Sequence, residues 1–423
     1  MSDHTTELTL VPKAPPAAPP PAPARGAASA PPAAAPSAAA PLVRREAVAR
    51  RHEQRLEFTG TGGDYFRVWI LNTLLTLATL GIYSAWAKRR KARWFARHTL
   101  LAGEPFDYHG DPRRLLAGRL FALALLAALF EAFGGGSGLG AGVALVAACF
   151  AIGPLLFASA RRFELTNTSW RGLRFGFHAE ATDVYAACLP LLLAWTLVAA
   201  VVGLNLGPLA DGLAALTVAL LLPLAHGRLT RLLQGQARYG SLAVDFQLSL
   251  DAFYRLYLQL GAVLIGAGVV AGLLALGVSK GVALALGANG STEARLATWL
   301  PLLALGIGWA VGRPIYVAGL QRLVWNSTRL AGGVDFACQV PTGTLLKTLL
   351  SGGALTLLTL GLYWPFLAVR VARLRVEGMI VRSDVPIERI LVRTPPPRGR
   401  GGGLGRVAAA DTAAGPFGLD IGW

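Results

Sequence analysis

Cysteine is scarce in this chain, with three residues among 423. Cys149 and Cys188 lie within apolar runs and Cys338 stands alone, so no pair has the spacing of metal ligands or of a redox motif. The motifs HExxH, GxSxG and CxxC do not occur either. We therefore expect no catalytic residue, no metal site and no cofactor, and we expect that the protein is not an enzyme.

Charged residues are also few, at 15%, whereas 54% of the chain is hydrophobic and the mean hydropathy is +0.50. This composition is too apolar for an ordinary soluble protein. A bilayer is crossed by about 20 predominantly apolar residues. Six runs are that long: Leu115–Phe133, Leu139–Ala160, Val184–Leu204, Leu206–Ala225, Tyr254–Val278 and Leu296–Val317. Two further runs, Tyr65–Trp86 and Gly343–Val369, have polar or glycine interruptions.

The charge balance is strongly basic, with 40 Lys and Arg against 23 Asp and Glu. The basic residues stand mostly at the ends of apolar runs, which is typical of contact with a membrane surface. We therefore expect the lipid bilayer and its anionic phospholipid headgroups as partners, and no nucleic acid.

Composition divides the chain into three parts. Residues 1–57 are Pro/Ala-rich and then basic, and are expected to form a disordered N-terminal arm. Residues 384–423 are rich in Gly, Pro and Arg and are expected to form a disordered C-terminal tail. Between them, residues 58–383 form the expected membrane domain.

Residue spacing within the membrane domain reveals a repeat. From origins at Ala85, Pro154, Pro223, Pro314 and Pro365, an Arg follows eight residues later in each case. A Thr lies fourteen residues on in three copies, and a Gly and a Phe recur further along in the first two. Recurrence at fixed offsets predicts repeated structural units. The five copies cover about 58–105, 106–174, 175–243, 244–335 and 336–383.

Each copy has an apolar stretch, then Arg, then a short segment such as Phe163–Phe177 that alternates apolar and polar residues around a Gly. The alternation predicts two small strands joined by a turn. We therefore expect an all-α polytopic membrane protein of six to eight transmembrane helices, with internal repeats and short β-hairpin-like segments. The first and last copies hold one apolar run each, and we expect them to seal the ends of the array.

The distribution of charge predicts the orientation. The strand-turn segments carry 17 Lys or Arg, whereas the intervening turns carry Lys280 and Arg295. By the positive-inside rule the strand-turn segments are cytoplasmic in a multi-pass protein. Two topologies remain for the runs Tyr65–Trp86 and Gly343–Val369. Each run either crosses the membrane once, or enters and returns. We favour the second alternative, which keeps both tails cytoplasmic.

One stretch also carries a family resemblance. The sequence "YFRVWILNTLLTLATLGIYSAWAKRRKARWFARHT", Tyr65 to Thr99, followed by "FDYHG" at Phe106 to Gly110, closely resembles the opening block of the YjgN-like bacterial inner-membrane proteins, a family catalogued as a domain of unknown function. The resemblance covers about residues 58–383. It implies the bacterial inner membrane and a multi-span fold, and it implies no activity.

Two sets of residues carry functional hypotheses. Asp211 and Glu131 lie within or beside apolar runs, where charge is costly, and could line a path for a solute or ion. The repeated arginines either bind lipid phosphates or anchor their own helix ends; they are Arg93, Arg162, Arg231, Arg322 and Arg373. The sequence thus leaves two functions open: a transporter or channel for a small solute or ion, and a non-enzymatic membrane scaffold or lipid-interacting envelope component.

Overall fold

A computed structural model describes residues 51–134, 139–286, 290–387 and 389. These residues belong to one structural unit, Arg50–Trp423. The expectations for residues 1–50 of the N-terminal arm and 390–423 of the C-terminal tail lie outside the described residues.

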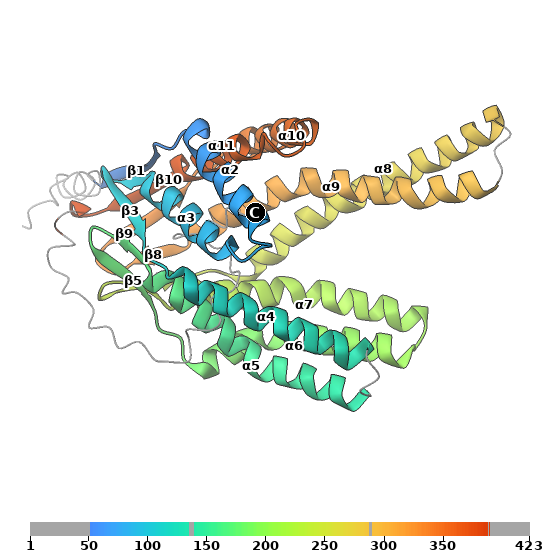
Figure 1. Cartoon of the computed structure of the whole chain (residues 1–423), viewed down its shortest axis with the longest axis horizontal. Helices are drawn as coiled ribbons and strands as arrows, with labels where there is room; N and C mark the ends of the chain where they lie inside the picture. Colours follow the sequence, from blue (N-terminus) through green and yellow to red (C-terminus); the bar gives the residue numbers. More distant parts are fainter. Residues whose placement is uncertain (1–50, 135–138, 287–289, 388, 390–423) are drawn as a thin grey trace, which may run out of the picture. The chain divides into compact units, whose positions relative to one another are not determined.

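Short strands alternate with pairs of helices along the chain (Figure 1). The strands are β1 (His52–Phe58), β2 (Thr99–Leu101), β3 (Glu104–Tyr108), β4 (Thr168–Trp170), β5 (Leu173–Phe177), β6 (Ala237–Tyr239), β7 (Leu242–Phe246), β8 (Thr328–Leu330), β9 (Val334–Cys338) and β10 (Met379–Ser383). The helices are α2 (Gly62–Ala78), α3 (Ser84–Arg97), α4 (Pro112–Gly134), α5 (Leu139–Thr166), α6 (Ala181–Leu204), α7 (Pro208–Gly235), α8 (Leu250–Leu286), α9 (Gly290–Asn326), α10 (Thr342–Leu358) and α11 (Trp364–Glu377).

The repeated glycines form tight β-hairpin turns. Ala102 and Gly103 have φ angles of 53° and 75°, and Arg171 and Gly172 have φ angles of 47° and 75°. Two successive positive φ angles define the type I′ turn, whose twist matches that of the flanking strands. Glycine recurs in these copies because the second turn position needs a backbone conformation that other residues adopt at a cost.

The repeated threonines join each helix to its strand. The hydroxyl of Thr99 donates to the carbonyl oxygen of Phe95 at 2.9 Å, and that of Thr168 donates to the carbonyl oxygen of Glu164 at 3.0 Å. Each threonine is buried, so the bond satisfies a hydroxyl that has left water. The repeat in the sequence therefore marks a repeated fold element, the passage from helix C-terminus to strand.

The strands close into a single antiparallel barrel in the order β1-β10-β9-β8-β7-β6-β5-β4-β3-β2. Its fifth hairpin is divided between the two ends of the domain, because β1 pairs with β10, with Gln54 opposite Val381. Phe66 of α2 also stacks on Phe366 of α11, with ring centroids 5.7 Å apart. The expectation that the terminal copies seal an open array is therefore wrong: they join each other and complete a ring.

The two shortened copies are helical hairpins with the same turn. In "TLGIY" Leu80 and Gly81 have φ angles of 50° and 93°, and in "TLGLY" Leu360 and Gly361 have the same values. The hydroxyl oxygen of Thr79 accepts the backbone N–H of Tyr83 at 2.9 Å, and Thr359 makes the equivalent bond at 3.0 Å. Each shortened copy is thus a pair of packed helices, with the turn inside its apolar run.

The expectation of an all-α protein with six to eight transmembrane helices is wrong. Ten strands form a closed barrel. Among the described residues, three segments are long and apolar enough to cross a membrane: Ala181–Val201, Pro208–Gly235 and Leu250–Val278. The runs Tyr65–Trp86 and Gly343–Val369, for which crossing and returning were both left open, reverse direction at their Thr-Leu-Gly turns. Residues 52–57, assigned to the disordered arm, belong to strand β1.

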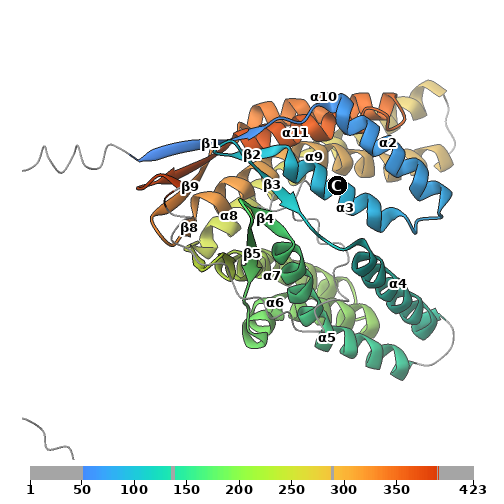
Figure 2. The same cartoon turned by 60° about the vertical axis from the view of Figure 1, so that its left-hand side comes forward.

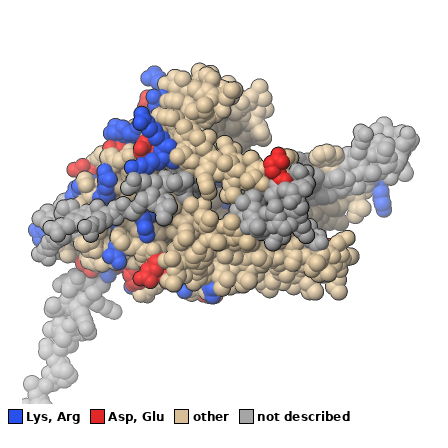
Figure 3. Space-filling model, turned by 60° about the horizontal axis from the view of Figure 1, so that its bottom comes forward, with Lys and Arg blue, Asp and Glu red and all other residues tan. Residues whose placement is uncertain are grey.

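Apolar and charged surfaces are separated between the two kinds of element. Figures 1 and 2 show the helical hairpins extending away from the strands on one side. The exposed large hydrophobic side chains of the described residues lie on helices and their connecting turns, apart from Val385. In Figure 3 the charged side chains gather at the strand end of the visible face. Such a distribution is typical of a protein whose helices lie in an apolar environment and whose barrel lies in water.

Candidate functional site: the barrel cavity

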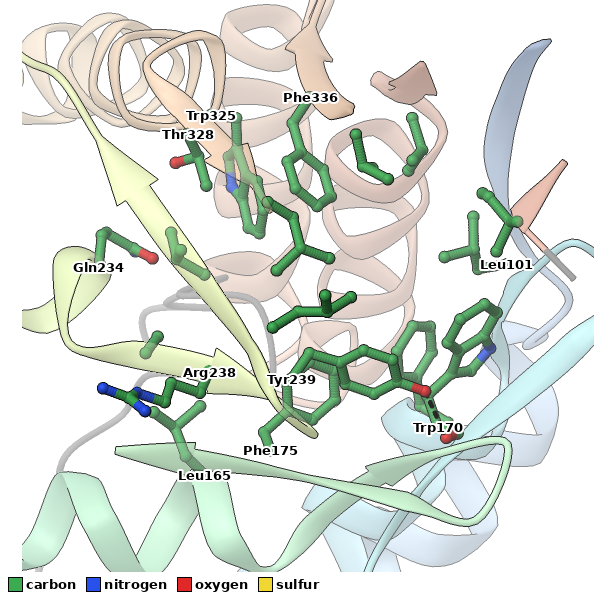
Figure 4. Close-up of a pocket in the computed structure, with 18 of the residues that line it drawn as sticks. Leu101, Leu165, Trp170, Phe175, Gln234, Arg238, Tyr239, Trp325, Thr328 and Phe336 are labelled. Carbon is green, nitrogen blue, oxygen red and sulfur yellow. Dashed lines mark hydrogen bonds between the residues drawn. The ribbon is translucent and has the colours of Figure 1, made fainter. Parts of the chain in front are cut away.

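The barrel encloses a cavity of about 110 Å³ (Figure 4). Side chains alternate across each strand, so one set of residues faces the lumen and the other faces outward. The outward set includes exposed charged residues such as Arg174 and Arg329. The strand residues lining the cavity are mostly apolar: Leu101, Phe106, Trp170, Phe175, Ala237, Arg238, Tyr239, Leu242, Val244, Thr328, Leu330, Val334, Phe336 and Val381.

Aromatic side chains form one wall of the cavity. The hydroxyl of Tyr239 donates to the carbonyl oxygen of Trp170 at 2.9 Å, and its ring lies 4.8 Å from that of Phe175. The indole N–H of Trp170 donates to the carbonyl oxygen of Glu104 at 3.2 Å. Burial raises the pKa of Tyr239 above its usual range, although Arg171 opposes this shift, so the hydroxyl stays neutral. Because these polar tips are bonded to backbone, the wall presents apolar ring surface.

Polar residues line the cavity at the ends of helices α5 and α7. They include Arg161 and Gln234, from successive repeat copies. The Arg161 side chain is 5% exposed, and its Nη1 donates to Glu164 Oε2 at 2.9 Å. Its Nε is buried and has no hydrogen-bond partner. Buried donors nearly always have one, and this atom has almost no accessible surface, so a group in the cavity does not reach it.

The chemistry available here is binding. Among the described residues, no group of three His, Cys, Asp or Glu side chains is placed to hold a metal ion. The side chains around the cavity are instead apolar rings, aliphatic groups and a few hydrogen-bond donors. Such a composition is typical of small-molecule binding sites. That the protein is not an enzyme stays a prediction.

The two acidic residues expected on a solute path lie at helix ends. Asp211 is exposed in the first turn of α7, and its N–H donates to the carbonyl oxygen of Gly207 at 3.1 Å. Glu131 is exposed near the C-terminal end of α4. Both positions belong to helices rather than to the barrel cavity. A role for either residue in transport stays a prediction.

The repeated arginines connect their helices to the barrel. Four of them reach across to the outgoing strand of their own unit or to residues just beyond it. The bonds are Arg93 Nε to Asp107 Oδ1 at 3.3 Å, Arg162 Nε to the Phe177 carbonyl oxygen at 3.3 Å, Arg231 Nη2 to the Leu248 carbonyl oxygen at 2.6 Å and Arg373 Nη2 to the Gly60 carbonyl oxygen at 3.0 Å. Arg322 instead bonds the carbonyl oxygen of Ala318 in its own helix, at 3.3 Å.

These contacts fit the anchoring interpretation of the repeat. Arg373 reaches Gly60 because β1 serves as the second strand of its unit. Around Arg93, burial raises the pKa of Asp107, but the hydrogen bond from Arg97 and the charge of Arg93 outweigh it and lower the pKa overall. Asp107 therefore remains an anion that holds both arginines. Binding of lipid phosphate by the five arginines stays a prediction.

The cavity was missed by reasoning from sequence, although one signal was visible. Aromatic residues two apart follow the first two glycine turns, Phe106 with Tyr108 and Phe175 with Phe177. A spacing of two puts both side chains on one face of a strand. Which face of the strand becomes the interior depends on closure of the barrel. No local sequence pattern indicates that closure.

Comparisons with known proteins agree with the membrane character of the helices. The family model described as "Bacterial protein of unknown function (DUF898)" matches residues 53–405. The inner membrane protein YjgN of Salmonella typhimurium is 27% identical over 360 residues, covering 79% of this chain and 90% of the relative. The Escherichia coli O157:H7 protein of that name is 30% identical over 144 residues, covering 32% of this chain and 35% of the relative. No solved structure matches. The chain therefore belongs to the DUF898 family of bacterial proteins, and it is a YjgN-like inner-membrane protein.

Proposed function

We propose that this protein binds a small apolar molecule, or the apolar part of an amphiphile, inside its barrel. It is then a lipid-interacting membrane component, one of the two functions expected from the sequence. The observation that carries this proposal is the apolar cavity of about 110 Å³ at the base of membrane helices. At about 30 Å³ for each water-sized group, that volume has room for about four. A ligand dissolved in the bilayer would reach such a cavity without first crossing bulk water.

An ion channel is the weaker alternative. Conduction needs polar groups along the path, such as carbonyl oxygens or rings of charged side chains. The lumen is lined instead by aromatic side chains, those of Phe106, Trp170, Phe175 and Tyr239. A transporter function is compatible with the proposed ligand binding, because a carrier also needs a site that binds and releases its cargo.

The barrel is further proposed to lie on the cytoplasmic surface of the inner membrane. Helix α3 carries Lys88, Arg89, Arg90 and Lys91 immediately before the strands, and basic residues concentrate on that side. Anionic headgroups are the proposed partners of this surface. Since β1 and β10 are neighbours in the barrel, residues 52 and 383 lie on the same side of the membrane as each other.

Cysteine labelling tests this orientation. In a cysteine-free background, Glu57→Cys and Arg174→Cys, both on exposed strand positions, are expected to react with a membrane-impermeant maleimide only after cells are opened. Lys280→Cys, exposed on α8 far along the hairpin from the barrel, is expected to react in intact cells with a permeable outer membrane. Reaction of the Glu57→Cys variant in such cells would contradict the proposed orientation.

Ligand entry is tested with 8-bromo-1-octanol, whose bromine quenches tryptophan fluorescence on contact. Trp170 and Trp325 both line the cavity. The purified protein in lipid nanodiscs is expected to show saturable quenching. Val244→Phe fills part of the cavity and is expected to lower the apparent affinity at least about tenfold, because each lost methylene contact is worth about 0.8 kcal/mol.

The matched control is Ala243→Phe, on the neighbouring and exposed position of the same strand. It adds a similar side chain to the outside of the barrel and should leave the quenching curve as in the wild type. Equal curves for both variants would show that the quencher reaches tryptophans elsewhere, and the barrel would not be the binding site.

A further inference from the structure

The tips of the two short hairpins carry the most exposed large hydrophobic side chains of the described residues. Leu80 and Leu360 are each 95% exposed. Along α2 the exposed fraction rises toward the tip, from 47% at Leu71 through 57% at Leu74 to 69% at Leu77. In Figures 1 and 2 both hairpins point away from the strands, as the longer hairpins do. An apolar surface of this kind marks contact with lipid or with another protein.

The backbone of each tip is satisfied within its own hairpin. Every backbone N–H from Thr79 to Ser84 has an acceptor there: five bond carbonyl oxygens, and that of Tyr83 bonds the Thr79 hydroxyl. The second tip repeats this pattern from Thr359 to Trp364. A turn in water can leave such groups to the solvent, whereas each unsatisfied group is costly in hydrocarbon. The tips are therefore built to leave water.

Arginines at one level of the helices show where the hydrocarbon begins. Arg228 is exposed seven residues before the end of α7, which is long and apolar enough to cross a membrane. From Arg228 to Pro208, at the other end of α7, the helix measures about 30 Å, which is the thickness of the hydrocarbon core. Arg90 and Arg370 are likewise exposed seven residues before the ends of α3 and α11. These two arginines therefore stand at the headgroup level on the barrel side.

The short hairpins end soon beyond that level. Helices α3 and α11 begin six residues before these arginines, or about 9 Å along the helix, whereas one leaflet of hydrocarbon is about 15 Å thick. Each guanidinium lies over a tyrosine at the tip: Arg90 Cζ is 5.8 Å from the Tyr83 ring centroid, and Arg370 Cζ is 5.7 Å from that of Tyr363. Tyrosine is typical of the membrane–water interface. Lys88, half a turn nearer to the tip than Arg90, also opposes a deeper position, because charge deep in hydrocarbon is costly.

We propose that the two tips enter the barrel-side leaflet of the bilayer and end within it, at a depth of about 10 Å. The acyl chains of that leaflet then cover Leu80 and Leu360, while its headgroup phosphates meet Arg90 and Arg370. Because α2 packs against α11, the two hairpins enter together. Such an anchor is independent of any ligand in the barrel.

Spin labels on single cysteines measure this depth in the full chain, in a cysteine-free background reconstituted into bilayers of zwitterionic lipid. Oxygen concentrates in hydrocarbon and a neutral nickel chelate in water, so the ratio of their collision rates with the label gives its depth. Labels at Leu80→Cys and Leu360→Cys are expected about 10 Å below the headgroup level. Thr217→Cys, exposed on α7 and eleven residues before Arg228, is the reference near the bilayer centre, at about 16 Å. Arg174→Cys, on the barrel, is the reference in water.

An intermediate depth at both tips supports the proposal, and three other results would overturn it. A tip label that meets the nickel chelate as often as the Arg174 label does would place the tips in water. A tip label as deep as the Thr217 label would mean that the hairpins reach the bilayer centre. A tip label that meets neither probe would mean that a second copy of the chain covers the tips. Both leucines are exposed, so the labels should not disturb folding.

Discussion

Leu56→Asp is expected to abolish folding of the membrane domain. Leu56 lies in the middle of β1, is 1% exposed and belongs to the main hydrophobic cluster. An unpaired carboxylate there loses the burial of leucine and the hydration of its charge, a total of about 4 kcal/mol or more. Whole domains are stable by about 5–15 kcal/mol. Because β1 pairs with both β2 and β10, its loss opens the ring at two seams.

Glu57→Gln provides the matched control, since the neighbouring residue is exposed on the outer face of the same strand. Its effect should stay within about 0.5 kcal/mol. Both variants can be compared by size-exclusion profiles of detergent-solubilised protein and by thermal stability of the folded fraction. A Leu56→Asp protein that is as abundant and as stable as the wild type would show that β1 is not needed for the barrel.

The importance of β1 was not visible in the sequence because its pattern has another reading. Only the last four residues of "HEQRLEF" alternate charged and apolar types. The segment also follows a basic stretch and contains a single buried pair, Leu56 and Phe58. Its two partners are strand β2, about 45 residues later, and β10, at the other end of the domain. Local reasoning cannot supply a partner at that distance, so the strand was assigned to the arm.

The hairpins themselves could be located, whereas the barrel could not. Thr99 and Thr168, with Gly103 and Gly172, are spaced as the helix-to-strand passage and its type I′ turn require. A single two-stranded hairpin is at best marginally stable in water. Five of them are stable here because each edge pairs with the next, a property of the ring rather than of any copy.

The two interrupted apolar runs left the number of spans undecided for a related reason. Length and hydropathy are the same for one long helix and for two short helices that pack together. The difference lies in Gly81 and Gly361, whose φ angles of 93° reverse the chain. Both glycines follow a leucine, Leu80 or Leu360, that is 95% exposed. The turn therefore cannot be recognised from the hydropathy of the stretch.

Gln321→Leu is expected to destabilise the protein by about 3 kcal/mol. Gln321 of α9 and Arg375 of α11 are both buried and bond each other twice, from Arg375 Nε to Gln321 Oε1 at 2.8 Å and from Gln321 Nε2 to the Arg375 carbonyl oxygen at 3.0 Å. Leucine fills a similar volume but accepts nothing, so one donor of a buried guanidinium loses its acceptor. The exposed Gln247, which bonds Asp245, gives a matched control, and Gln247→Leu should cost under about 0.5 kcal/mol.

The pair can be separated from its surroundings by a double-mutant cycle in denaturant titrations of the purified protein. Arg375→Leu alone leaves the Gln321 amide buried, whereas the double variant removes both polar groups together. The double variant should therefore be more stable than the sum of the single losses predicts, by about 1–3 kcal/mol. Strictly additive losses would mean that the two residues act independently. They would also remove the reason to regard this contact as the polar link that holds α11, the last helix of the ring, against α9.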